Sequence, residues 1–128
     1  MNLQRLWWAL GVLIVAAAVV VCLLPNADLP PSFSFNDKLS HVFGHALMAV
    51  YFSGLVARAR WWKIFVFQLL LGVCIEIAQG TMHIGREADV IDVIANSIGA
   101  LLGLGAARLG LARWPEAAAW ILGRRAVQ

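Results

Sequence analysis

The sequence predicts an all-α fold, an integral membrane bundle of four transmembrane helices. Of the 128 residues, 62% are hydrophobic and 13% are charged, whereas a soluble domain carries about 25% charged residues. Four apolar stretches, at about residues 6–24, 39–57, 61–79 and 90–111, have close to the 20 residues that a helix needs to cross a bilayer. Little chain remains outside these stretches, so residues 1–128 are predicted to form a single transmembrane domain.

Charged residues are sorted between the two ends of this predicted bundle. Most cations fall on one side if the chain crosses the membrane four times, and the positive-inside rule places that side in the cytoplasm. We therefore predict that the N- and C-termini are cytoplasmic. The cations on that side are Arg5, Arg58, Arg60, Lys63, Arg108, Arg113, Arg124 and Arg125. These charges do not gather in one patch, so the net charge of +3 is not interpreted as a sign of a nucleic-acid partner.

Two segments outside the spans have recognisable local patterns. The stretch 25–31 contains three prolines, which remove backbone donors and restrict their neighbours, so it is predicted to be an extended outer connector. Residues 115–125 start with Pro115-Glu116 and place apolar residues beside two arginines. This pattern predicts an interfacial helix that lies on the inner membrane surface.

Small residues recur every four positions along the fourth predicted span. Such a stripe lets a second helix approach the backbone closely. It predicts tight helix packing, and a homo-oligomer formed through the stripe is one arrangement that it allows. The stripe consists of Ala95, Gly99, Gly103 and Ala107.

Polar residues on three spans share one depth, just beneath the predicted outer surface. On the second span, Asp37, His41 and His45 are four residues apart and therefore lie on one helical face. Charged side chains are costly in a bilayer, so they need partners or a wet cavity. We predict one pocket that unites the three helices and includes Arg86 from the short loop between the third and fourth. The other polar residues on these spans are Lys38, Glu76, Gln79, Asp89, Asp92 and Asn96.

Several of these residues also have purely structural interpretations. Asp37 and Asp89 precede helical runs and suit helix capping. Glu76 lies inside a span, where an ion pair with Arg86, Lys38 or a histidine is the structural alternative. The spacing of His41 and His45 suits a metal ion with Glu76 or Asp92 as third ligand. No flanking glutamate completes a known zinc motif, so no metal ligand is predicted, and no cofactor is identified.

The order of these polar motifs resembles that of the VanZ-like family of small membrane proteins. The matching residues, in order, are Asp37-Lys38-x-x-His41, Glu76-x-x-Gln79, and Arg86-x-x-Asp89-x-x-Asp92-x-x-x-Asn96-x-x-Gly99-x-x-x-Gly103. The resemblance implies a multi-pass protein of the bacterial cytoplasmic (inner) membrane with a role in the cell envelope. The family's namesake is associated with antibiotic resistance, specifically to teicoplanin. His45 departs from the pattern, which has an aromatic residue at that position.

Two functions fit the predicted pocket, and a third interpretation is structural. In the first, the pocket binds a lipid head group, a lipid-linked wall precursor or an amphiphilic glycopeptide-type compound. Cationic Lys38 and Arg86 meet an anion, and the remaining polar side chains, among them His45, Gln79, Asp89 and Asn96, complete the ligand-binding set. The structural interpretation is a subunit of a membrane complex held by the small-residue stripe.

The second function is enzymatic, as a hydrolase or transferase acting on a lipid or lipid-linked substrate at the outer leaflet. His41 is the candidate for proton transfer, because histidine side chains, with an unperturbed pKa of about 6.5, suit general acid–base chemistry near neutrality. Asp37 or Glu76 would orient it, Arg86 would stabilise developing charge, and Asp92 completes the candidate catalytic set. No hydroxyl nucleophile stands out in the sequence.

Overall fold

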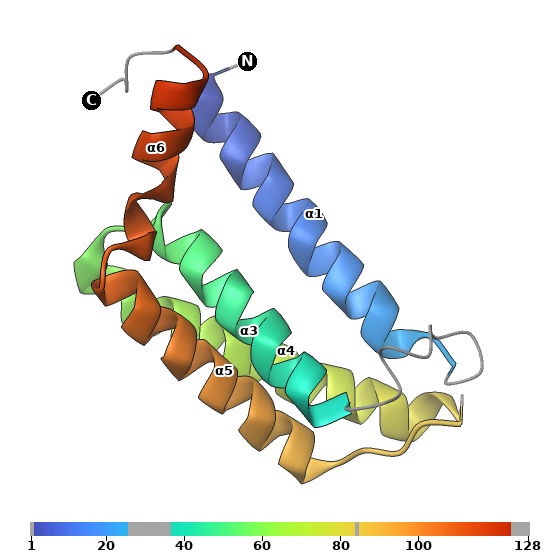
Figure 1. The fold of residues 1–128 in the computed structure, drawn as a ribbon. Coiled ribbons are helices and arrows are strands. Elements are labelled where there is room, and N and C mark those ends of the chain that lie inside the picture. The colour runs from blue at the N-terminus through green and yellow to red at the C-terminus, as the bar shows by residue number, and fades with distance from the viewer. Residues whose placement is uncertain (1, 26–36, 84, 124–128) are drawn as a thin grey trace.

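The structure is a computed structural model that describes residues 2–25, 37–83 and 85–123. Within those ranges the regular structure is entirely helical. The long helices are α1 (Leu3–Leu23), α3 (Asp37–Ser53), α4 (Trp61–Met82) and α5 (Val90–Arg108), followed by the short α6 (Trp114–Ile121). Two 3₁₀ turns, Arg58–Arg60 and Leu111–Arg113, precede α4 and α6. In Figure 1, α3, α4 and α5 form one group, while α1 runs along its edge.

Among the described residues, three helical segments are long and apolar enough to cross a membrane: α1, Arg58–Met82 and α5. The prediction of four spans is therefore supported for three of them. The second predicted span, 39–57, corresponds to α3, which begins at Asp37 and ends at Ser53 after 17 residues. It ends early because the chain turns at Gly54, and the Trp61 indole donates to the carbonyls of Ser53 at 3.2 Å and Val56 at 3.1 Å.

The ends of the other helices are close to the predicted ones. The fourth span ends at Arg108 instead of residue 111, since Gly110 takes a positive φ of 122° and redirects the chain. The tail helix is shorter than the predicted 115–125, and ends at Ile121. Residues 124 and 125, and most of the proline-rich connector, lie outside the described residues.

Close packing of α3 against α5 forms the centre of the bundle. Ala49 on α3 and Ala100 on α5 are completely buried. Gly99 and Gly103 are buried too, and a Cβ at either position would overlap the backbone of α3 at Val42 or Ala46. The predicted stripe of small residues thus packs against a helix of the same chain, and the self-association predicted from it stays a prediction.

Helix α1 packs loosely against the other helices along its length and contacts them through hydrogen bonds near its two ends. At one end the Tyr51 hydroxyl donates to the Trp7 carbonyl at 2.7 Å, and the Trp7 ring packs edge-on against Trp114. At the other end the Gln79 amide donates to the Cys22 carbonyl at 2.6 Å. Between them, only 6% of the apolar window of α1 is buried. Apolar surface between α1 and its neighbours is therefore available to lipid or ligand.

The α3–α5 contact can be tested by adding one methyl group to α5. Gly99→Ala should lower the free energy of unfolding by about 1–3 kcal/mol, because the methyl group meets the α3 backbone. Gly105→Ala is the matched control, since a Cβ there meets open space. The control should be neutral or gain up to about 1 kcal/mol of helix propensity. Denaturant titration in micelles measures both, and equal effects of the two substitutions would contradict the described packing.

Candidate functional site

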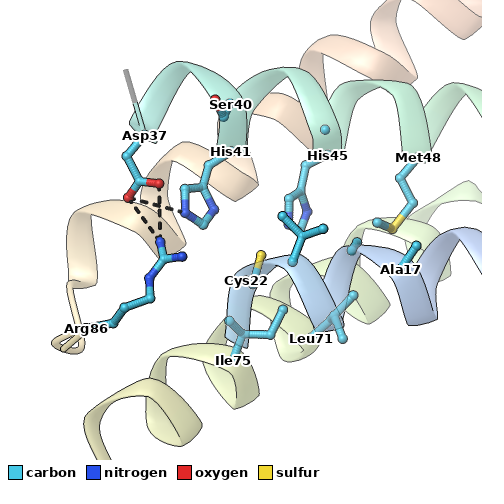
Figure 2. A pocket seen from close by; sticks show the side chains of 13 residues that line it. Ala17, Cys22, Asp37, Ser40, His41, His45, Met48, Leu71, Ile75 and Arg86 are labelled. Atoms are coloured by element: carbon cyan, nitrogen blue, oxygen red, sulfur yellow. Dashed lines mark hydrogen bonds and ion pairs between the residues drawn. The ribbon is translucent and has the colours of Figure 1, made fainter. Parts of the chain in front are cut away.

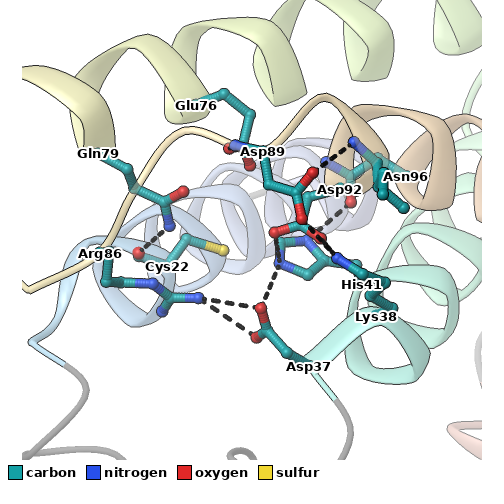
Figure 3. Close-up of polar contacts among 11 residues, drawn as sticks. Cys22, Asp37, Lys38, His41, Glu76, Gln79, Arg86, Asp89, Asp92 and Asn96 are labelled. Atoms are coloured by element: carbon teal, nitrogen blue, oxygen red, sulfur yellow. Dashed lines mark hydrogen bonds and ion pairs between the residues drawn. The ribbon is translucent and has the colours of Figure 1, made fainter.

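Polar side chains from α3, α4 and α5 meet at the end of the bundle where α3 and α5 begin (Figure 3). We call this group the polar cluster, and the end it occupies the polar end. Three of its members, His41, Glu76 and Asp92, are buried although each is ionisable. The sequence-based prediction that three helices share one polar site is therefore met in the structure. The cluster consists of Asp37, Lys38, His41, Glu76, Arg86, Asp89, Asp92 and Asn96.

Lys38 joins α3 to the beginning of α5 through two carboxylates. Its ammonium lies 2.7 Å from Asp89 and 2.8 Å from the buried Asp92. Asp89 also caps α5, since its side chain accepts from the Ile91 amide at 2.8 Å, so it combines capping with an ion pair. The hydrogen bond from Lys38, aided by that from Ile91, lowers the pKa of Asp89 below its ordinary value. Asp89 is therefore a carboxylate at neutral pH.

Arg86 binds the first residue of α3 from the loop between α4 and α5. One guanidinium nitrogen lies 3.2 Å and 3.5 Å from the two oxygens of Asp37. The Arg86 side chain is only 8% exposed, whereas that of Asp37 is 45% exposed. A largely desolvated cation is thus held by a carboxylate that remains open to solvent.

His41 lies at the centre of the polar cluster. Its Nδ1 is 2.9 Å from the Asn96 amide oxygen, which can only accept, so Nδ1 carries the proton in this arrangement. Its Nε2 faces Asp37 at 3.8 Å and Asp92 at 3.7 Å. These distances exceed those of direct hydrogen bonds. A water molecule or a small bound group could bridge the histidine and the two carboxylates.

The same three side chains also have the spacing of a cation site. One ligand atom from each of Asp37, His41 and Asp92 lies within 4.8 Å of the others. A nitrogen and two carboxylate oxygens are ligands that several divalent metals accept. In the described part of the chain, this group does not include His45, so the two histidines do not form the pair considered from their spacing.

His45 has a partner that the sequence analysis did not identify. Its Nδ1 lies 2.8 Å from the Gln68 side-chain amide, and Gln68 is among the most completely buried residues. With its amide nitrogen toward His45, Gln68 donates to both the ring and the carbonyl of His45 and accepts from the Ala49 amide. The sequence signal for this contact was Gln68 itself, a strongly polar residue within an apolar span. Periodicity does not show which helix such a residue contacts.

Glu76 and Gln79 on α4 have structural contacts. The predicted ion pair of Glu76 with Lys38, Arg86 or a histidine is not found among the described residues. One of its oxygens accepts from the Asp89 backbone amide at 2.7 Å, and the other is buried without a partner. The two cations are already bound by aspartates, which explains the difference. Gln79, predicted to bind a ligand, donates to the Cys22 carbonyl of α1 and also lines the polar cavity.

Two adjoining cavities open at the polar cluster. An apolar groove of about 250 Å³ runs between α1, α3 and α4, where Ala17, Met48 and Leu71 line it (Figure 2). At one end of this groove are Asp37, His41 and Arg86. A polar cavity of about 420 Å³ lies beyond them, lined by Lys38, Gln79, Asp89 and Asp92 among others. Asp37 and Arg86 line both spaces, so an apolar and a polar cavity adjoin at this ion pair.

The long apolar helices and the exposed hydrophobic side chains along them define a membrane protein with a buried polar cluster. The family comparison agrees with the motifs: a family model described as VanZ/LLP1 matches residues 9–112. The chain belongs to the VanZ/LLP1 family. Neither curated proteins nor solved structures give a match to this chain.

The position of His41 can be tested through Asn96. Asn96→Ala leaves the buried Nδ1 of His41 without its partner, so the free energy of unfolding should fall by about 1–3 kcal/mol. Ser97→Ala is the control, because the hydrogen bond of the Ser97 hydroxyl within the described ranges is to the Val93 carbonyl of its own helix. Nitrogen NMR of the imidazole in the same variants should show loss of the Nδ1–H preference in Asn96→Ala alone. An unchanged His41 spectrum would contradict the contact.

Proposed function

We propose that the chain crosses a bacterial cytoplasmic membrane four times, with both termini in the cytoplasm and the polar cluster beneath the outer surface. A helix of 17 residues such as α3 is about 26 Å long, close to the roughly 30 Å of a hydrocarbon core. Leu39, Phe43 and Leu47 are exposed at four-residue intervals along α3, as expected of a lipid-facing stripe. The cations at the opposite end of the bundle favour a cytoplasmic position for that end.

The function that we propose for the site is binding of an amphiphile with a phosphate-bearing or carboxylate-bearing head group. A lipid head group, a lipid-linked wall precursor and a glycopeptide-type compound all belong to this class. The observation that carries the proposal is that an apolar groove and a polar cavity adjoin, with Asp37 and Arg86 lining both. An acyl chain fits the groove beside Met48 and Leu71, while the head group occupies the polar cavity.

The charges in the polar cluster favour a head group that carries both signs. Two cations, Lys38 and Arg86, face the carboxylates of Asp37, Asp89 and Asp92. Arg86 has five N–H donors, and its side-chain contacts with Asp37, within the described part of the chain, use one nitrogen. A phosphate can bind the remaining donors, while an ammonium group of the same ligand neutralises the solvent-exposed side of Asp37. A zwitterionic phospholipid fits this pattern better than a simple anion.

Binding should depend strongly on Arg86. Arg86→Gln removes a charge-assisted contact to the head group, so affinity for a short-chain phosphatidylethanolamine should fall roughly tenfold to a hundredfold. Arg108→Gln, which removes a cation from the other end of α5, should leave affinity within about twofold. Calorimetric titration of the purified protein in micelles measures both. Equal affinity of the wild type and Arg86→Gln would contradict binding at this site.

Acid–base catalysis on a bound lipid is the second candidate function. It is favoured by His41, whose Nε2 faces two carboxylates and which lines the groove next to Arg86. In that position His41 can accept a proton from water while Asp37 and Asp92 stabilise the resulting imidazolium. Arg86 would stabilise negative charge on the reacting group. In this mechanism Asp92, which faces His41, orients the imidazole in place of Glu76, because Glu76 accepts from the backbone amide of Asp89.

Lipid analysis of cells distinguishes catalysis from binding. Membrane lipids and lipid-linked wall precursors are compared by mass spectrometry in cells that lack the protein, carry it, or carry His41→Gln at matched abundance. Catalysis predicts a covalent species that needs the intact protein, with its formation slowed about 10²-fold to 10⁴-fold in His41→Gln. An unchanged lipid inventory would exclude catalysis on those substrates and leave binding as the function.

A further inference from the structure

A second groove lies between α1 and the α3–α4 pair, at the end of the bundle opposite the polar cluster. Its volume is about 760 Å³. Trp8 of α1, Phe52 of α3 and Phe67 of α4 form an aromatic wall, with ring centroids 6.0 Å apart for the first pair and 6.4 Å for the second. Arg60 and Lys63, at the start of α4, also line it. We call this space the cationic groove.

The cationic groove differs from the polar cluster in the pairing of its charges. In the polar cluster both cations are bound by aspartates. The cationic groove has no carboxylate in its lining, and neither Arg60 nor Lys63 forms an ion pair within the described ranges. Lys63 lies over the ring of Trp62, 5.6 Å from its centroid, which leaves the positive charge uncompensated by an anion.

The start of α4 adds to this positive field. The helix begins at Trp61 without a capping side chain and has no acidic residue in its first turn. The amino end of a helix carries a partial positive charge. Arg60, Lys63 and this helix end together attract an anion to the mouth of the groove.

The occupant must be apolar along most of its length. Val12 and Val15 of α1 line the groove, and Val12 is 65% exposed, so the apolar wall continues onto the lipid-facing surface of α1. A free phosphate would meet the cations but leave this wall empty. The acyl chain of a lipid from the surrounding leaflet would cover it.

We propose that the cationic groove binds an anionic phospholipid, with its phosphate at Arg60 and Lys63 and an acyl chain along Val12, Val15 and Phe67. This site is separate from the amphiphile site at the polar cluster. It joins α1 to α4 where direct packing between them is sparse, so the lipid would serve as a bridging element between the two helices.

The test uses two double variants that remove the same charge from the same end of the protein. Arg60→Gln with Lys63→Gln removes the cations of the groove, and Arg5→Gln with Arg108→Gln removes two exposed cations outside its lining. Each protein is purified in micelles containing equal phosphatidylglycerol and phosphatidylcholine, and native mass spectrometry counts the lipids retained. The wild type should retain phosphatidylglycerol preferentially. The groove variant should bind it roughly tenfold more weakly, and the control within about twofold of the wild type.

A third variant separates the acyl chain from the charge. Val15→Trp fills the groove while keeping both cations, and it should also reduce retention of phosphatidylglycerol. Addition of inorganic phosphate should not displace the lipid, and Arg86→Gln should not alter its retention. Equal losses in the two double variants would show general attraction to an anionic surface and overturn the proposal. In an Arg86→Gln background, which weakens the amphiphile site, retention of phosphatidylcholine as strongly as phosphatidylglycerol would overturn it as well, and so would competition by phosphate.

Discussion

The polar cluster depends on how closely α3 approaches α5. Gly99 and Gly103 place the backbone of α5 directly against that of α3, and this separation allows short side chains to meet across the interface. His41 reaches Asn96, and Lys38 reaches Asp89 and Asp92. All of these residues lie within about three helical turns of the point where Gly99 meets Val42. A wider separation would leave the same ionisable groups buried without partners, at a cost of several kcal/mol per group.

The two ends of the molecule handle charge differently. At the polar end, cations and carboxylates neutralise one another, and a molecule bound beside them would have to compete with existing ion pairs. Such a site favours selectivity for head-group structure, since a ligand must replace each contact that it displaces. At the other end, Arg60 and Lys63 lack acidic partners among the described residues, so an anion bound there would not have to displace one. Because α1 packs sparsely against α3 and α4 between its end contacts, a groove remains beside it towards each end of the bundle.

Sequence periodicity predicted the helices and the faces of their polar residues, and it correctly brought His41, Asp92 and Asn96 to one site. It could not assign partners among chemically equivalent groups. Glu76 was predicted to pair with a cation, but Lys38 and Arg86 are paired with aspartates. Glu76 accepts from the Asp89 backbone amide. The contact between Gln68 and His45, and the loose packing of α1, depend on how the helices are arranged in three dimensions, which periodicity does not give. The length of α3 was overestimated because apolar residues continue beyond the turn at Gly54.

We propose that one amphiphile occupies the apolar groove and the polar cavity together. Photo-crosslinking with a zwitterionic phospholipid that carries a photoreactive group on its acyl chain tests it most directly. Peptide mapping should place the label on groove residues such as Ala17, Met48 and Leu71, and Arg86→Gln should strongly reduce this labelling. Label confined to the lipid-facing side chains Leu47 and Leu70, equally in both proteins, would contradict the account.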